Sequence, residues 1–174
     1  MNINVILMYN FLNKKICSDN HGKTKECAAT YDQTHLLSFC VSEQSCEPDW
    51  LQFDGSCYYL SLVKSDWHKA RSACTKKGAD LAVITSEREQ IFLTTKSAAS
   101  PSRLFWIGLH DSTDEGAWEW VDGTNYESSY KSWKEGEPND HYGDEDCAHM
   151  WTAGEWNDAL CSNGQRYAIC EKKL

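Results

Sequence analysis

The sequence of 174 residues predicts an α+β domain preceded by an extension. Two segments with helical spacing of apolar residues come early, and short apolar runs typical of strands dominate the later part of the chain. Within that later part, about twenty residues from Asn125 to Asp146 show neither period. Loops of this length are usually functional or disordered, so this segment is the first place to look for a site.

Two helices are expected. The first covers residues 65–77, because one of its first two residues can cap it and Gly78 can end it. The second begins at Ser86 and runs to about Lys96. Ser86 followed by Glu89 is a capping box, in which each side chain accepts a hydrogen bond from the other residue's backbone N–H.

Short apolar runs predict the strands. The run at 117–121 alternates apolar and polar residues before the turn at Asp122-Gly123. The six segments expected to form strands are 57–60, 81–84, 105–109, 117–121, 147–151 and 167–171.

The net charge of −9 argues against nucleic acid as a partner, since nucleic-acid binding needs a basic face. The acidic residues are unevenly distributed, with eight Asp or Glu and no Lys or Arg between Glu135 and Asp158. A solvated acidic face is one interpretation. The mixture with Asn, Pro, Trp and Cys favours a site instead.

Nine cysteines in a chain of this length indicate an oxidising compartment. Zinc ligation is the alternative, but no Cys-x-x-Cys pair and no His pair with finger spacing occurs. We therefore expect disulfides, and a secreted protein or the ectodomain of a membrane protein. Residues 1–16 make a poor signal peptide and no stretch is long enough to span a bilayer, so one interpretation is that the targeting segment lies upstream.

The chain divides into an N-terminal extension, 1–45, and a domain, 46–174. The extension has no clear periodicity and carries Cys17, Cys27 and Cys40. Three is an odd number, so at least one thiol is free, bonded to another chain or bonded to a missing part of this one. We hypothesise either an interchain disulfide, which would give a homo-oligomer, or a truncated chain.

Three motifs flank or lie in the long irregular segment: Glu137-Pro138-Asn139, Glu145-Asp146 and Trp156-Asn157-Asp158. They supply carboxylate and amide oxygens, which are the ligands that calcium prefers. The amides also provide hydrogen-bond donors. Such a site can hold a metal and still present donors and acceptors to a polyol.

These motifs, together with Trp106-Ile107-Gly108-Leu109 and six cysteines in order from Cys46 onward, resemble the long form of the C-type lectin-like domain with a mannose-type Glu-Pro-Asn motif. The resemblance implies the double-loop fold of that family, with two helices, small antiparallel sheets and a long calcium-binding loop. Six cysteines allow fifteen pairings. The family implies three of the possible pairs: Cys46–Cys57, Cys74–Cys170 and Cys147–Cys161.

The resemblance also implies two calcium sites. The residues that match the principal site are Glu137, Asn139, Glu145, Asn157 and Asp158. Those that match the auxiliary site are Asp111, Glu115, Asp140 and Asp146. Without a cation these acids would repel one another, so calcium should order the loop. The alternative for the auxiliary set is a group of solvated acids at a surface turn.

In the family, two neighbouring hydroxyls of a hexose bind the principal calcium ion, each donating to a carboxylate and accepting from an amide. The Glu-Pro-Asn order, with a cis bond before Pro138, goes with mannose, fucose and N-acetylglucosamine. The residues expected to bind carbohydrate are Glu137, Asn139, Glu145, Asn157, Asp158, His141 and Tyr142. An aromatic residue beside the site can stack on galactose, so galactose-type glycans or a protein ligand remain the alternatives.

A non-enzymatic function is expected. Glu137 and Glu145 could be posed as a glycosidase pair, but carboxylates that ligate calcium are poor general acids and no nucleophile–His–Asp set is visible. One hexose has about twelve heavy atoms, which at roughly 0.3 kcal/mol each gives near-millimolar affinity. Binding to glycans or glycoproteins is therefore expected to need several domains presented together.

Overall fold

The computed structural model describes residues 15–18, 24–29, 38–39, 45–99, 104–141, 143–151 and 153–174. The chain separates into two compact units, Met1–Gln44 and Ser45–Leu174. In the first unit, three antiparallel strands form a sheet in the order β1 (Lys15–Ser18), β2 (Thr24–Ala29) and β3 (Ser38–Phe39). The pairing of the three cysteines of this unit lies outside what the structure describes and stays a prediction.

The second unit combines two helices with an eight-stranded mixed sheet, which confirms the α+β class. The helices are α2 (Trp67–Thr75) and α3 (Glu87–Ser97). The strands are β4 (Leu51–Phe53), β5 (Ser56–Leu60), β6 (Asp80–Leu81), β7 (Phe105–His110), β8 (Glu119–Trp120), β9 (Cys147–Met150), β10 (Trp156–Ala159) and β11 (Tyr167–Lys173).

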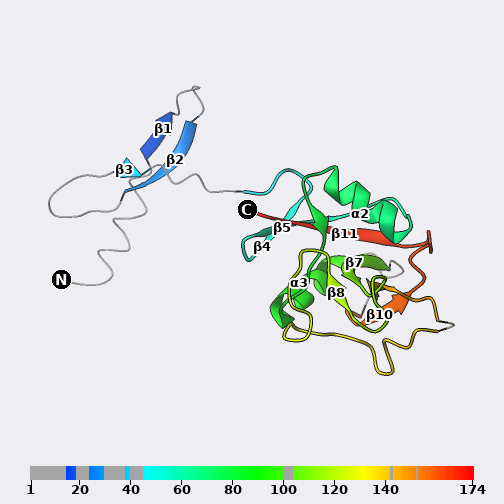
Figure 1. Ribbon diagram of the computed structural model, residues 1–174. Helices are drawn as coiled ribbons and strands as arrows, with labels where there is room; N and C mark the ends of the chain where they lie inside the picture. Colours follow the sequence, from blue (N-terminus) through cyan, green and yellow to red (C-terminus); the bar gives the residue numbers. More distant parts are fainter. Residues whose placement is uncertain are drawn as a thin grey trace. The chain divides into compact units, whose positions relative to one another are not determined.

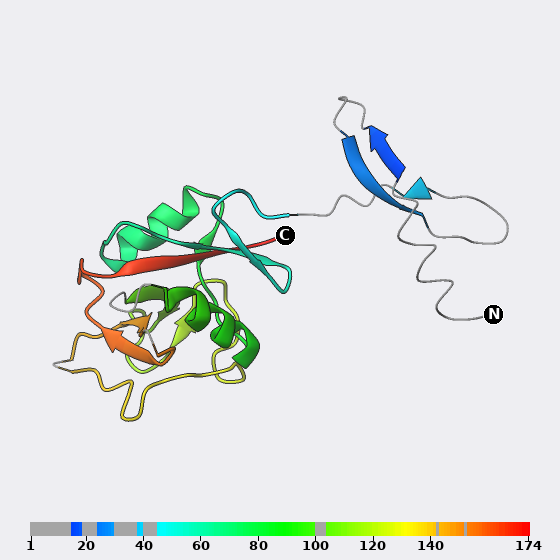
Figure 2. The same ribbon diagram turned by 180° about the vertical axis from the view of Figure 1, so that it is seen from behind.

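Strand β11 lies at the centre of the sheet, whose order is β10-β9-β7-β11-β5-β4. It runs antiparallel to β5 and parallel to β7, while β6 pairs with β11 and β8 with β7. Helix α2 lies on one side of β11, and β7, β8 and β10 lie on the other (Figures 1 and 2). No helix among the described residues is both long and apolar enough to cross a membrane.

Both helices begin where the sequence predicts. The Asp66 side chain caps α2 by accepting from the Lys69 backbone N–H at 2.8 Å, and Ser86 caps α3 by accepting from the Glu89 N–H at 3.2 Å. The second hydrogen bond expected of the capping box, from the Ser86 backbone N–H to the Glu89 side chain, is wrong. The Glu89 carboxylate accepts instead from the Thr85 N–H at 2.9 Å and from the Tyr58 hydroxyl at 2.5 Å, because the side chain turns into the protein interior.

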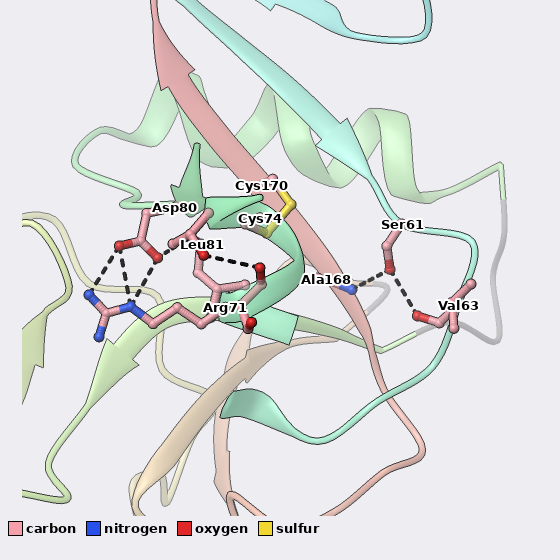
Figure 3. The surroundings of a disulfide bond; sticks show 10 residues. Ser61, Val63, Arg71, Cys74, Asp80, Leu81, Ala168 and Cys170 are labelled. Atoms are coloured by element: carbon pink, nitrogen blue, oxygen red, sulfur yellow. Dashed lines mark hydrogen bonds and ion pairs between the residues drawn. A yellow bond between two sulfur atoms is a disulfide. The ribbon is translucent and has the colours of Figure 1, made fainter. Parts of the chain in front are cut away.

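Three disulfides occur in the second unit: Cys46–Cys57, Cys74–Cys170 and Cys147–Cys161. These are the pairs that the family resemblance implies. Figure 3 shows how Cys74–Cys170 joins α2 to β11. Beside it, the Arg71 guanidinium donates to Asp80, whose carboxylate also accepts from the Leu81 N–H at 2.8 Å. The helix, β6 and β11 are thereby fixed to one another.

The core is rich in tryptophan. Five of the eight are buried: Trp67, Trp106, Trp118, Trp120 and Trp156. The indole N–H groups of Trp67 and Trp106 donate to backbone carbonyls at 2.9 Å, so burial leaves neither unpaired. Gly108 allows β7 to approach the 80–82 segment, because a Cβ there would lie 2.8 Å from the Leu81 carbonyl oxygen.

The strand predictions need four corrections. The run at 81–84 is buried, but its strand ends at Leu81. The Ala82 N–H still donates to Ile169 O at 2.9 Å, whereas the Val83 N–H donates to the Glu171 side chain rather than to a neighbouring strand. The strand expected at 117–121 contains only Glu119–Trp120. Two strands, β4 and β10, were not predicted; β4 is three residues long, and β10 carries the polar motif that was interpreted only as a ligand set.

Candidate metal and carbohydrate-binding site

The described residues of the long segment, 125–141 and 143–146, form no helix or strand, and part of the segment lies along β10. Its backbone is bonded to that strand in two places. The Trp156 N–H donates to Ser132 O at 2.7 Å, and the Lys134 N–H donates to Trp156 O at 2.9 Å. Residues 132–134 of the segment are therefore bonded to the residue that directly precedes Asn157 and Asp158.

Asp158 holds the Glu-Pro-Asn motif against β10. Its side chain is fully buried, and Oδ2 accepts from the backbone N–H groups of Asn139 at 2.9 Å and Asp140 at 2.7 Å. The peptide bond between Glu137 and Pro138 is cis. Two segments almost twenty residues apart in the sequence therefore meet at one carboxylate.

The other residues of the principal set surround this point. The Asn139 side-chain amide donates to Glu137 Oε2, and the Asn157 amide donates to the Asp158 backbone carbonyl. Glu145 Oε2 accepts from the His141 N–H at 3.1 Å, and its charge reaches Glu137. The structure thus brings Glu137, Asn139, Asn157 and Asp158 into one cluster, with Glu145 beside it.

One oxygen of this cluster has no hydrogen-bond donor. Asp158 Oδ1 is buried and unpaired, and the carboxyl group of Glu137 contacts the Asp158 carboxylate. Burial raises the pKa of Glu137, and the contact with Asp158 and its charge raise that pKa further. A buried carboxylate oxygen that faces another acid and no donor fits a cation better than it fits the protein alone.

The auxiliary set contains a tighter acidic cluster. Oxygens of Asp111, Glu115 and Asp146 lie within 4.8 Å of one another. Asp111 is 3% exposed; its Oδ2 accepts from the Gly116 N–H at 3.0 Å, whereas its Oδ1 is buried without a donor. This cluster could hold a metal ion through oxygen ligands, as calcium requires.

The pKa shifts of this cluster follow from burial and mutual repulsion. Burial raises the pKa of Asp111, with Asp146 adding to the effect, and burial likewise raises the pKa of Asp146. The charge of Asp111 is the main cause that raises the pKa of the exposed Glu115. Each shift favours the proton over the bare carboxylate, so a cation would relieve all three.

Asp140 lies outside that cluster. Its Oδ1 accepts from the Glu145 N–H at 3.1 Å, and its charge contributes to the raised pKa of Asp111. It therefore connects the two sets without joining the compact group. Within the described residues, the three carboxylates of the principal set do not come as close together as the auxiliary trio.

His141 is exposed, and Tyr142 lies outside the described residues, so its expected role stays a prediction. His149 is not a candidate ligand: it is buried, and its Nε2 contacts the Arg166 guanidinium at 3.3 Å. Burial lowers the pKa of His149 to about 3, with the Arg166 charge contributing.

Sequence reasoning missed Lys134. Its ammonium lies 4.3 Å from the centre of the Trp151 ring, immediately beside the principal set. Its position in the sequence could have indicated it, because Lys134 is the last basic residue before the acidic stretch that begins at Glu135.

The comparisons with known proteins agree with this geometry. The family model described as the lectin C-type domain matches residues 63–172. The hepatic lectin of Gallus gallus is 46% identical over 125 residues, covering 72% of this chain and 58% of that protein. Asialoglycoprotein receptor 1 of Rattus norvegicus is 42% identical over 139 residues, covering 76% of this chain and 47% of that protein.

A solved structure gives the same result. The cow C-type carbohydrate-recognition domain of CD23, determined in the presence of a GlcNAc2Man3 oligosaccharide, superposes with a TM-score of 0.69 at 35% identity, covering 75% of this chain and 97% of that domain. The two curated relatives are a lectin and a receptor rather than enzymes. This chain spans about half the length of the two curated relatives named above. It belongs to the C-type lectin family and contains a C-type lectin carbohydrate-recognition domain.

Proposed function

We propose that the domain formed by residues 46–174 is a calcium-dependent lectin for mannose-type sugars, with calcium held by the principal and auxiliary sets. The observation that carries the proposal is the buried Asp158 Oδ1, which has no donor although it lies beside the Glu-Pro-Asn motif. An oxygen-rich pocket with amides among its ligands suits calcium and leaves donors for a sugar.

The principal set would bind a sugar through two pairs of side chains. A bound calcium ion supplies coordination positions for two neighbouring hydroxyl oxygens. Glu137 with Asn139 would serve one hydroxyl, and Glu145 with Asn157 the other, each carboxylate accepting and each amide donating. The amide of Asn139 now donates to Glu137, so sugar binding would redirect that donor.

The auxiliary set would order the loop. Asp111 and Glu115 lie beyond β7, and Asp146 ends the long segment, so one ion held by the three would join the two parts of the chain. Its effect on sugar binding would be indirect, through the position of Glu145, which directly precedes Asp146.

The choice of mannose-type sugars rests on the order of carboxylate and amide in Glu137-Pro138-Asn139. The name of the rat relative refers to asialoglycoproteins, whereas the cow domain was solved with a mannose-containing oligosaccharide. Galactose-type binding is therefore the second candidate, favoured by the aromatic residue in His141-Tyr142.

We further propose that the domain functions outside the cell, as part of a secreted protein or an ectodomain. The three disulfides support an oxidising compartment. Because a single hexose binds at about millimolar strength, useful affinity needs several domains together. An interchain disulfide through Cys17, Cys27 or Cys40 is one way to assemble them, and electrophoresis with and without reductant tests it.

Retention on mannose-agarose and galactose-agarose, first in calcium and then in EDTA, tests the proposal. The expected result is calcium-dependent retention on mannose. Retention on galactose alone would keep the calcium mechanism and overturn the sugar class. Failure to bind either column while calcium still binds would favour a protein ligand.

The double variant Glu137→Gln, Asn139→Asp tests the ligand pairs. Exchanging the positions of amide and carboxylate should move the preference toward galactose, because the hydroxyl geometry is selected by their order. The single variant Glu135→Gln changes an exposed acid of the same loop and should leave the preference unchanged. An unchanged preference in the double variant would contradict the pairing.

A further inference from the structure

The main chain of Lys134 is hydrogen-bonded on both sides at the edge of the principal set. The Lys134 N–H donates to Trp156 O at 2.9 Å, one residue before Asn157. The Lys134 carbonyl accepts from the Glu137 N–H, also at 2.9 Å. Lys134 is therefore bonded to both segments that supply the principal ligands, and its side chain starts next to them.

The side chain of Lys134 is held on an aromatic surface. Its ammonium lies 4.3 Å from the centre of the Trp151 ring, a cation–π contact between two half-buried residues. The backbone of Trp151 is fixed in turn, since its backbone N–H donates to Glu155 O at 2.8 Å in the turn before β10. The contact keeps the ammonium near the site at little further loss of side-chain entropy.

The charge of Lys134 is not matched by an acid. Among the described residues it forms no ion pair, whereas Lys69, Lys172 and Lys173 each do. It also stands directly before a stretch of eight acids that contains no basic residue. Its field reaches Glu137, a carboxylate of the principal set. A cation without an ion-pair partner at the edge of the principal set can bind an anionic group of a ligand.

We infer that Lys134 and Trp151 form a second contact area, which recognises an anionic group on a glycan bound at the principal set. The ammonium would donate to a sulfate, phosphate or carboxylate, and the exposed part of the indole would pack on the sugar that carries it. This inference rests on the proposed lectin function and narrows its ligands to glycans that are acidic near the bound sugar.

Competitive elution from the sugar column that retains the protein tests the inference. Mannose is compared with mannose 6-phosphate, and N-acetylglucosamine with its 6-sulfate, in excess calcium at fixed ionic strength. If galactose-agarose is the column that retains the protein, galactose and its 6-sulfate take their place. The wild type should prefer the anionic member of at least one pair roughly threefold or more, as a single charge-assisted contact allows. The preference should fall as salt is added.

Lys134→Gln should bring this preference to about one while neutral sugars bind as before, and Lys134→Arg should keep it. Lys131→Gln is the matched control. Lys131 lies in the same loop with its ammonium 4.3 Å from the centre of the Tyr126 ring, but it donates to the carbonyls of Tyr126 and Glu127. Its loss should leave the preference unchanged.

Equal potency of every anionic and neutral pair in the wild type would overturn the inference. So would a preference that survives in Lys134→Gln. Either result leaves the lectin proposal intact, because the neutral sugars still elute the protein in both cases. If the protein is retained on neither neutral sugar column in calcium, the lectin proposal itself fails, and the inference fails with it.

Discussion

Two groups of buried carboxylates in this domain differ in how their oxygens are satisfied. In the scaffold, Glu89 and Glu171 are 6% and 7% exposed, and all four of their oxygens accept hydrogen bonds from protein donors. In the loop region, Asp111 and Asp158 are buried at least as deeply, yet one oxygen of each has no donor.

The direction of the pKa shift is the same for Glu89 in the scaffold and for Asp111 near the loop. Burial raises the pKa of Glu89, just as it raises that of Asp111. The difference lies in the donors: Tyr58, Ser56 and backbone N–H groups complete the scaffold pair, and nothing in the described chain completes the loop pair. Complete hydrogen bonding by the protein is typical of a structural role, whereas a buried carboxylate oxygen without a protein donor is suited to bind a cation.

Asp158→Asn is the strongest test of this contrast. Removing one direct ligand should weaken calcium binding at the principal site by at least about 100-fold and abolish calcium-dependent retention on the sugar column. Stability in EDTA should be unchanged or higher, since the amide oxygen can still accept from the Asn139 and Asp140 N–H groups and the repulsion with Glu137 is removed. Calorimetry and urea unfolding measure the two effects. Wild-type calcium affinity in the variant would contradict the assignment.

Glu171→Ala should have the opposite effects: it should lower stability in EDTA and leave calcium binding unchanged. It leaves the Val83 N–H and the Ser56 hydroxyl without their acceptor, which should cost about 2 kcal/mol of unfolding free energy in EDTA. The folded fraction should bind calcium with normal stoichiometry. A loss of calcium binding without a loss of stability would show that the scaffold and the loop are not separate in function.

His149→Gln tests a smaller effect at the junction of the two regions. Because burial lowers the pKa of His149 to about 3, below its ordinary value, the unfolded chain takes up a proton first and stability falls as the pH drops below about 6.5. Between pH 6.5 and 5 in EDTA, the wild type should lose about 1–2 kcal/mol more than the variant, which can still accept from Arg166. Parallel pH profiles for the two proteins would show that His149 is not buried in its neutral form.

The sequence predicted the helices well, because their caps are local. Asp66 and Ser86 act on N–H groups three residues away, and no tertiary contact is needed to place them. Strands depend on partners: in the apolar run at 81–84, backbone pairing continues through Ala82 and ends where the Val83 N–H donates to the distant Glu171 side chain. No local pattern contains that information.

For the candidate site, too, one part could be predicted from the sequence and another could not. The motifs predicted which residues form the site, and in the structure Asp158 contacts the backbone of Asn139 and Asp140. Whether an acid is paired by the protein cannot be read from the residues alone. Glu89 had the pattern of a helix cap and belongs to a buried network, and Lys134 had no motif at all.

The most direct test is a calorimetric titration of the calcium-free protein with calcium at pH 7.5. Each of the two buried carboxylate oxygens without a donor, on Asp111 and Asp158, marks one ion. The predicted result is two calcium ions per chain, one of which is lost in Asp158→Asn. A single ion in the wild type, or none, would contradict the view that missing donors mark the cation sites.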